Sequence, residues 1–150
     1  MNTDIYRILK ACGYCSLKND RENICALISR IIKEYNIPHF DHSNIIDTVI
    51  QYNGLSVDAS VAMRKSMVIS NFHGGFQLSL QYVIDNYEYL YDDYTETVKY
   101  TGADVLPVGN AFDDLLLINS QGEIYVGSIK AGKNWEDFLE KLISDQLKEL

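Results

Sequence analysis

The hydrophobic positions follow a helical period through the first third of the chain. Between residues 24 and 35, apolar side chains recur every three or four positions, which is the spacing of one helix face. Residues 19–20, Asn-Asp, are good N-terminal caps, and Pro38 cannot continue a helix. We therefore expect a helix that begins near residue 20 and ends before Pro38. A short helix over residues 3–11 is expected before it.

A third helix and two short strands are expected next. Ser43 is placed to cap this helix, and Gly54 is placed to end it. Its inward positions are apolar and share helical spacing: Ile45, Ile46, Val49 and Ile50. Beyond Gly54, residues 55–59 and 67–69 have the short apolar pattern that favours strands.

The second half of the chain predicts a helix, three strands and a closing helix. The helix is expected over residues 80–97, with an acidic, tyrosine-rich outer face. Three apolar strand candidates follow, at residues 105–108, 115–118 and 123–127. Gly122 provides the positive φ that a hairpin between the last two strands requires. One apolar stripe then runs from Trp135 to Leu147 and predicts the closing helix.

This order of elements predicts an α+β fold. We expect the 150 residues to form a single domain, with an antiparallel sheet packed against N-terminal, central and C-terminal helices and covered on one side. No window approaches 18 consecutive apolar residues, and no basic patch precedes an apolar run near the start. The sequence therefore predicts no membrane association and no secretory signal, which places the protein in the cytoplasm.

The negative charge of the protein is concentrated in the middle of the chain. Between residues 66 and 129, Lys99 is the only base beside nine acids, so this segment carries the whole net charge of −8. Such a field attracts a cationic partner and repels nucleic acid phosphates. The alternative is that the acidic residues only keep the protein soluble.

The three cysteines and the histidines give weak signals for redox or metal chemistry. Cys12 and Cys15 are two residues apart, but Cys12 follows an expected helix end, whereas a thioredoxin-like pair follows a strand. A zinc site would need two more ligands. Cys25, His39 and His42 form no ligand motif with the pair, so only the fold could bring them close to it. Three cysteines also suit a reducing compartment. We interpret them as small hydrophobic residues and expect no metal and no cofactor.

No pattern in the sequence predicts catalysis. Serines are plentiful, but no GxSxG motif is present, and the glycines after His73 lack the pattern of a phosphate-binding loop. The carboxylate pairs at residues 92–93 and 113–114 are direct neighbours, which point apart on a helix or strand. We therefore expect no catalytic residues and no enzyme.

A cluster of tyrosines and acids is the strongest candidate for function. Residues 82–94 contain five tyrosines and four acids. Tyrosine is enriched at protein interfaces, and acids beside it meet Arg and Lys of a partner. The alternative is that the tyrosines cover the protein's own sheet, with Tyr82, Tyr89 and Leu90 the residues expected to do so.

Several motifs in the second half occur together in one known family. Pro107-Val108-Gly109 gives a PxG turn, residues 115–118 give an apolar strand, and residues 122–127 give a G-x-(V/I)-Y strand. The expected helix over residues 134–142 begins after a small polar turn. In this order the motifs resemble the third branch of the SUKH superfamily of bacterial immunity proteins.

Two motifs in the first half extend the resemblance over nearly the whole chain. The branch carries an N-terminal Gly-Trp signature with an Arg four residues after the Trp; here Gly13, Tyr14 and Lys18 occupy these places. On this interpretation Tyr14 is the aromatic anchor and the flanking cysteines are incidental. Residues 49–55, VIQYNGL, are similar to the family's helix end F-L-x-x-F-G-G-L.

The resemblance implies function by binding. SUKH proteins are mostly immunity proteins that stay in the cytoplasm and block a cognate polymorphic toxin, often a nuclease, in competition between bacteria. The resemblance therefore predicts that the partner is a protein toxin domain. The acidic segment favours a toxin domain that is basic. The superfamily offers no fixed binding residues, so candidates come from charge and composition: Tyr87, Glu88, Tyr91, Asp92, Asp93 and Tyr94, with Phe112, Asp113 and Asp114 as a second patch.

Two other functions remain open from the sequence. One is an intracellular SUKH-like regulatory module that binds a host protein or small ligand without any toxin. The other is a thiol enzyme that uses Cys12 and Cys15. The oligomeric state is also open, because acidic and tyrosine-rich surfaces serve self-association as well as capture.

Overall fold

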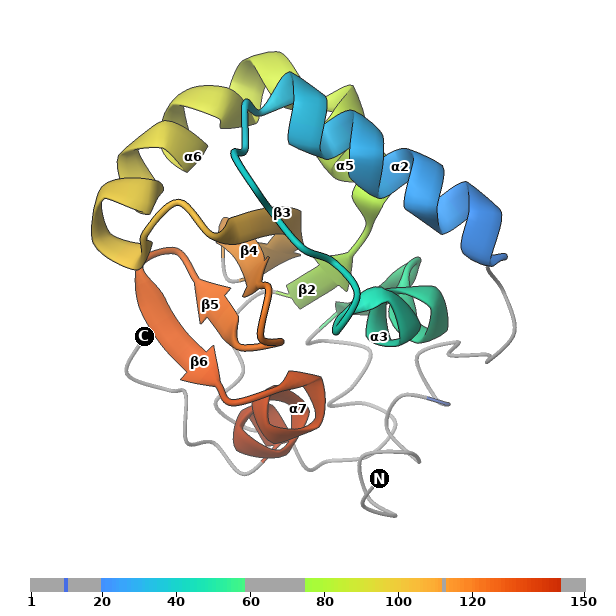
Figure 1. Cartoon of the computed structure of the whole chain (residues 1–150). Helices are drawn as coiled ribbons and strands as arrows, with labels where there is room; N and C mark the ends of the chain where they lie inside the picture. Colours follow the sequence, from blue (N-terminus) through green and yellow to red (C-terminus); the bar gives the residue numbers. More distant parts are fainter. Residues whose placement is uncertain (1–9, 11–19, 59–74, 112, 144–150) are drawn as a thin grey trace.

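A six-stranded antiparallel sheet with helices packed against it forms the described part of the protein (Figure 1). The computed structural model describes residue 10 and residues 20–58, 75–111 and 113–143. The elements in chain order are α2 (Arg21–Glu34), α3 (Ile46–Tyr52), β1 (Leu55–Asp58), β2 (Gly75–Leu78), α5 (Leu80–Asp85), α6 (Tyr87–Thr101), β3 (Val105–Ala111), β4 (Asp114–Asn119), β5 (Ile124–Val126), β6 (Ile129–Gly132) and α7 (Trp135–Ile143). This arrangement confirms the α+β class.

Each strand of the sheet pairs with its neighbour in the sequence, so the strand order is β1-β2-β3-β4-β5-β6. The predicted strands are confirmed as β1, β3, β4 and β5. Strands β2 and β6 were not expected. The sheet extends across β2 through the register Leu55↔Leu78 and Phe76↔Ala111, and β6 joins the opposite edge through Val126↔Ile129.

Helix α2 forms as its apolar spacing predicts. The Asp20 carboxylate caps it by accepting a hydrogen bond from the backbone N–H of Asn23 at 2.8 Å, and Ile24, Ile28 and Ile31 are buried. The next helix begins later than expected. Ile45 is the N-cap of α3, while the N–H of Ser43 donates to Asp41. The prediction of Ser43 as the cap is therefore wrong, because this segment forms a turn of its own.

The helix expected over residues 80–97 is two helices that meet at Asn86. Ser79 caps α5 by accepting a hydrogen bond from the N–H of Tyr82 at 3.1 Å. Asn86 ends α5 and begins α6, and its side-chain amide donates to the carbonyl oxygen of Tyr82 at 2.9 Å. An Asn side chain that bonds to the backbone in this way competes with continued helix, which accounts for the break.

The hairpin predicted between β4 and β5 is confirmed. Gly122 has a φ of +90°. The Asn119 side-chain oxygen accepts hydrogen bonds from the backbone N–H groups of Gln121 and Glu123, at 3.1 and 2.9 Å. One side chain thus satisfies two donors of the turn, which is the role that favours Asn in turns.

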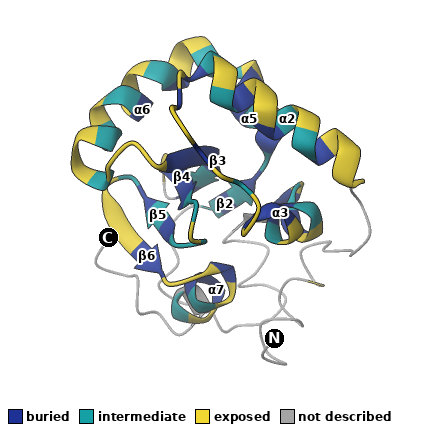
Figure 2. Ribbon diagram, viewed as in Figure 1, coloured by how far each residue is buried: buried dark blue, intermediate teal, exposed yellow. Residues whose placement is uncertain are grey.

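Helices cover both faces of the central strands. Residues 115–118 of β4 are all buried, and successive side chains of a strand point to opposite faces, so both faces must be covered. Helices α2, α5 and α6 pack against β3, and the ring of Phe138 on α7 lies 5.7 Å from that of Phe76 on β2. The expectation of a sheet covered on one side is therefore wrong. Figure 2 shows buried positions along the strands and exposed positions on the outer sides of the helices.

Several sequence predictions fall outside the described residues. These are the helix over 3–11 apart from residue 10, the strand over 67–69, Cys12, Cys15, the motif residues Gly13, Tyr14 and Lys18, Phe112, and the end of the closing stripe at Leu147. In the part of the chain that is described, no helix has both the length and the hydropathy to cross a membrane.

Candidate binding surface along helix α6

The tyrosines on the inner side of α6 pack against α2. The ring centroid of Tyr35 lies 5.2 Å from that of Tyr87 and 5.4 Å from that of Tyr94, both in edge-to-face geometry. Tyr91 completes the cluster at 5.1 Å from Tyr87, and its hydroxyl accepts a hydrogen bond from Asn36. These side chains join the two helices.

Two of these tyrosines are tied to the backbone below them. The Tyr94 hydroxyl donates to the carbonyl oxygen of Val105 on β3, and the Tyr35 hydroxyl donates to that of Val83 on α5, each at 2.8 Å. Burial raises the pKa of both phenols above the usual tyrosine value. Only 4% of Tyr94 is exposed, so its part is to hold α6 on the sheet rather than to meet a partner.

The opposite flank of α6 is exposed and combines acids with tyrosines. Tyr89, Asp93, Glu96 and Tyr100 stand at positions i, i+4, i+7 and i+11, which place them in one row along a helix. Tyr89 is 76% exposed and Tyr100 is 74% exposed. The expectation that Tyr89 covers the sheet is wrong, because the 3.6-residue period turns it away, while its neighbour Leu90 is buried as expected.

Two turns of the sheet lie at the same end and face this row. In an antiparallel meander alternate turns share one end, so the β3–β4 and β5–β6 turns come together. The first contains Asp113, whose φ of +68° is a conformation that Asp tolerates better than most residues. The second begins at Gly127, with a φ of +57°, where a Cβ would lie 3.3 Å from the Asp114 carboxyl carbon. Asp114 therefore lies against the second turn.

Between the row and these turns lie two adjoining hollows, which we call the α6 groove. The larger has a volume of about 310 Å³ and is lined by residues that include Tyr89, Asp93, Asp113 and Asp114. The smaller, of about 200 Å³, is lined by residues that include Glu96, Tyr100, Asp114 and Ile129. Asp114 belongs to both. The groove thus joins an α-helix flank to two sheet turns that are distant in sequence.

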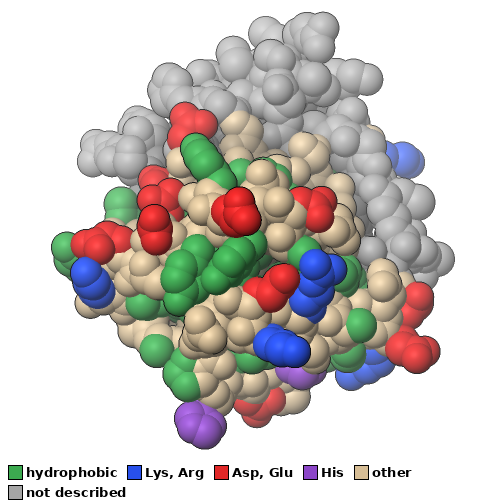
Figure 3. All heavy atoms as spheres, turned by 90° about the horizontal axis from the view of Figure 1, so that it is seen from above, with side chains coloured by type: hydrophobic (Ala, Val, Ile, Leu, Met, Phe, Trp, Pro, Cys, Tyr) green, Lys and Arg blue, Asp and Glu red, His purple; other side chains and the backbone are tan. Residues whose placement is uncertain are grey.

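The charge of the groove is negative. Of the described residues that line it, none is Lys, Arg or His, and four are acidic: Asp93, Glu96, Asp113 and Asp114. Glu96 also pairs with Lys99 at 2.9 Å on the solvent side. Viewed over the helices, acidic side chains gather on the side of α6 and most of the Lys and Arg side chains on the side of α2 (Figure 3).

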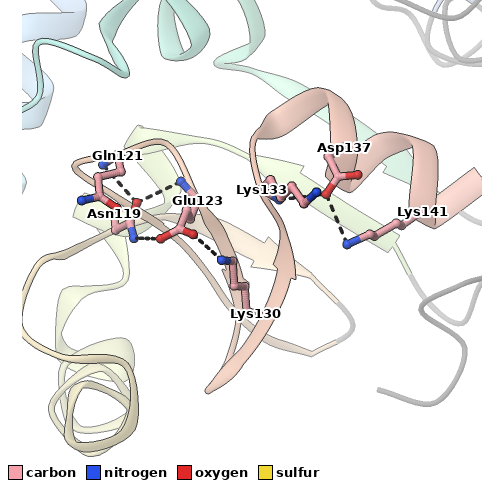
Figure 4. Close-up of polar contacts among 7 residues, drawn as sticks. All are labelled: Asn119, Gln121, Glu123, Lys130, Lys133, Asp137 and Lys141. Atoms are coloured by element: carbon pink, nitrogen blue, oxygen red, sulfur yellow. Dashed lines mark hydrogen bonds and ion pairs between the residues drawn. The ribbon is translucent and has the colours of Figure 1, made fainter.

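Other lysines near the sheet have carboxylate partners of their own (Figure 4). Lys130 pairs with Glu123, and this hydrogen bond keeps the pKa of Glu123 below its usual value. On α7, Lys141 pairs with Asp137 at 3.2 Å. Both carboxylates, Glu123 and Asp137, lie outside the α6 groove.

The groove has no arrangement for a metal ion. Within residues 20–58, 75–111 and 113–143, no three His, Cys, Asp or Glu side chains lie close enough together to hold one. Cys25 is a half-buried free cysteine that packs against the core, and His39 lies in a loop with a φ of +52°. The acids of the groove are spread along a surface, a layout that suits a partner of many atoms.

The structure separates the candidate residues into three groups. Asp93, Asp113 and Asp114 come together in the α6 groove, although no pattern in the sequence indicates that the two patches meet. Glu88 and Asp92 are exposed outside it. Tyr87, Tyr91 and Tyr94 lie on the α2 side and Phe112 lies outside the described residues.

Most of the lining residues were not among the sequence candidates, and Tyr89, Glu96, Tyr100 and Ile129 belong to this group. A helical wheel over residues 87–101 would have found the first three, because their spacing alone puts them in a row with Asp93. Ile129 had no such signal, since β6 itself was not expected.

No family model, curated protein or solved structure matches the chain. The SUKH resemblance therefore stays a prediction that rests on the motifs of the sequence.

Proposed function

We propose that the protein is an immunity protein, which binds a basic toxin domain in the bacterial cytoplasm and neutralises it without catalysis. The α6 groove is the observation that carries this proposal. It offers four carboxylates and two exposed tyrosine rings on one side of the molecule. The SUKH resemblance of the sequence supports the same function.

The groove has the groups that a capture surface needs. Carboxylates raise the association rate with a basic partner, and aromatic rings that become buried slow its dissociation. A stable complex buries roughly 1,200–2,000 Å² in total, so the groove would be the centre of a wider interface. Occlusion of the toxin's active cleft by such an interface is sufficient for neutralisation.

The test is co-expression of the chain with the C-terminal domain of the protein that the adjacent gene encodes. We expect a complex that survives affinity purification, weakens as salt is raised, and restores growth to cells that express the domain. The double variant Asp93→Lys, Asp114→Lys reverses two charges of the groove and should abolish both capture and rescue. The matched control is Glu88→Lys, Asp92→Lys, which makes the same charge change outside the groove.

The proposal is wrong if the unmodified chain neither captures the domain nor restores growth. A regulatory module without a toxin partner would then become the better explanation. If both double variants lose binding equally, the protein still captures the toxin, but the groove is not where it does so.

A further inference from the structure

The α6 groove repeats one combination of groups in each of its two hollows. In the larger, the ring of Tyr89 accompanies the carboxylates of Asp93, Asp113 and Asp114. In the smaller, the ring of Tyr100 accompanies Glu96 and the shared Asp114. An aromatic face next to carboxylates favours a planar cation, which can stack on the ring while the carboxylates bind its charge.

Exposure sets these rings apart from the other large hydrophobic side chains. Among the described residues, three large hydrophobic side chains are exposed: Tyr89, Tyr100 and Ile129. All three line the groove. Apolar surface collected at one place and rimmed by polar groups marks a contact site. The tyrosines of the same helix that face α2 are packed, and Tyr91 and Tyr94 are also hydrogen-bonded, so the exposure of Tyr89 and Tyr100 is particular to this flank.

The guanidinium of arginine matches this combination better than other cations. It is planar, stacks on aromatic rings, and donates two parallel hydrogen bonds to a carboxylate. The ammonium of lysine is compact and strongly hydrated, so it gains less from a ring. Among the described residues, no three His, Cys, Asp or Glu side chains are grouped as ligands of a metal ion.

The dimensions indicate two long side chains from one extended segment. At ~30 Å³ per water, the hollows of 310 and 200 Å³ hold roughly ten and seven water volumes, the space of a side chain rather than of a helix. The α6 residues that line the larger hollow, 89–93, and those that line the smaller, 96–100, are about seven positions apart, or about 10 Å at 1.5 Å per residue. An extended chain covers this distance in three to four residues.

We infer that the α6 groove binds two arginines four residues apart on an extended segment of the partner, a spacing that puts both side chains on the same face of that segment. The first guanidinium lies between Tyr89 and Asp93, and the second lies between Tyr100 and Glu96, with Asp114 between the two. The inference rests on the proposed function, because it names the part of the basic toxin that the groove takes.

The test uses short peptides, so that it does not depend on the identity of the toxin. The probe is Arg-Gly-Ser-Gly-Arg with blocked ends, and its matched controls replace both arginines with lysine or one arginine with glycine. Binding is measured by titration of the ¹⁵N-labelled full chain, with amide shifts followed for α6 and the β3–β4 turn. We expect shifts localised to the groove and affinity about fivefold higher for the arginine peptide than for the lysine peptide.

Variants of the protein locate the binding. Tyr89→Ala, Tyr100→Ala should remove the preference for arginine over lysine, while Asp93→Asn, Glu96→Gln should weaken both peptides severalfold. Glu88→Gln, Asp92→Asn removes the same charge outside the groove and should change neither. All these residues are exposed on α6 at positions that leave its packed side unchanged, and circular dichroism verifies the fold.

Equal affinity for the arginine and lysine peptides, equal weakening by the two double charge variants, or no detectable binding would each overturn the inference. These results are separable from the toxin test. Capture and growth rescue without arginine preference would leave the proposed function in place and remove only the arginine site. Peptide binding in the groove without capture of any toxin would leave the arginine site in place and remove the proposed function.

Discussion

The hydroxyl of Tyr94 and the carbonyl oxygen of Val105 form a 2.8 Å hydrogen bond that ties α6 to β3. The bond is buried and connects the helix to a central strand of the sheet. It fixes how α6 is rotated about its axis, and with it which residues reach the groove.

Replacement of Tyr94 by Phe should lower the free energy of unfolding by about 1 kcal/mol, because it removes one buried hydrogen bond and leaves the ring in place. Urea unfolding at neutral pH measures the change. Tyr89→Phe is the matched control, since Tyr89 is 76% exposed and its replacement should have no measurable effect. Equal losses in the two variants would contradict the structural part assigned to Tyr94.

Stability should fall as the pH rises above about 10, the usual pKa of tyrosine. Burial raises the folded-state pKa of Tyr35 and Tyr94, so between the unfolded and the folded pKa the folded state holds protons that the unfolded state has lost. The contribution of the two tyrosines to the free energy of unfolding is complete below the pKa that they have in the unfolded state, and it decreases as the pH rises above that value. The urea midpoint measured from pH 8 to pH 11 shows the decrease.

The double variant Tyr35→Phe, Tyr94→Phe serves as the control for this pH dependence. It lacks both titrating groups, so its midpoint should change less between pH 9 and pH 11 than that of the unmodified chain. An identical slope for the two proteins would assign the alkaline loss to other groups.

Gly109→Ala should destabilise the protein by about 3 kcal/mol, through overpacking between β2 and β3. A Cβ at this position would lie 1.9 Å from the backbone oxygen of Gln77, and a backbone atom cannot move aside without breaking the strand pairing. Thermal or urea unfolding measures the loss.

Gly122→Ala separates this crowding from the general effect of losing a glycine. Gly122 has nothing within 4 Å of its Cβ position but a φ of +90°, so its replacement should cost only about 1–2 kcal/mol of strain. A smaller loss at Gly109 than at Gly122 would show that β2 and β3 pack less closely than the structure has them.

Reversal of single charges on α6 should affect toxin association unequally. Asp93→Lys places a cation in the α6 groove and should slow association about tenfold or more at low salt. Asp92→Lys makes the same change in net charge one position earlier, about 100° around the helix, and should have a much smaller effect. Stopped-flow association rates at two salt concentrations measure the difference. Equal slowing by both variants would mean that total charge, rather than the groove, guides the partner.

The sequence predicted the elements whose pattern is long and strongly periodic. Helix α2 follows from its repeated isoleucines, and β3, β4 and β5 follow from apolar runs bounded by turn residues. Strand β2 has only four residues, begins at Gly75 and has no β-branched residue, so its alternation is too short to mark a strand. Strand β6 also has four residues and ends in Ala-Gly, with Ile129 as its one β-branched residue.

The candidate site was harder to predict than the fold, because it depends on which face of α6 meets α2. Composition alone does not distinguish Tyr87, which packs on Tyr35, from Tyr89, which is exposed. That choice is made by tertiary packing. The meeting of Asp93 with Asp114 likewise follows from the sheet topology, since only the meander brings the β3–β4 turn to α6.

The division of α6 into a packed side and an open side has a consequence for how such a protein diversifies. The core residues Leu90, Leu115 and Val126 line the groove, but its polar groups come from an exposed helix flank and two turns, and the rings of Tyr35 and Tyr94 that hold α6 lie outside it. Surface substitutions of this kind usually change stability by less than 0.5 kcal/mol. The chain can therefore exchange one partner for another by changing a few surface residues, while the same scaffold is inherited unaltered.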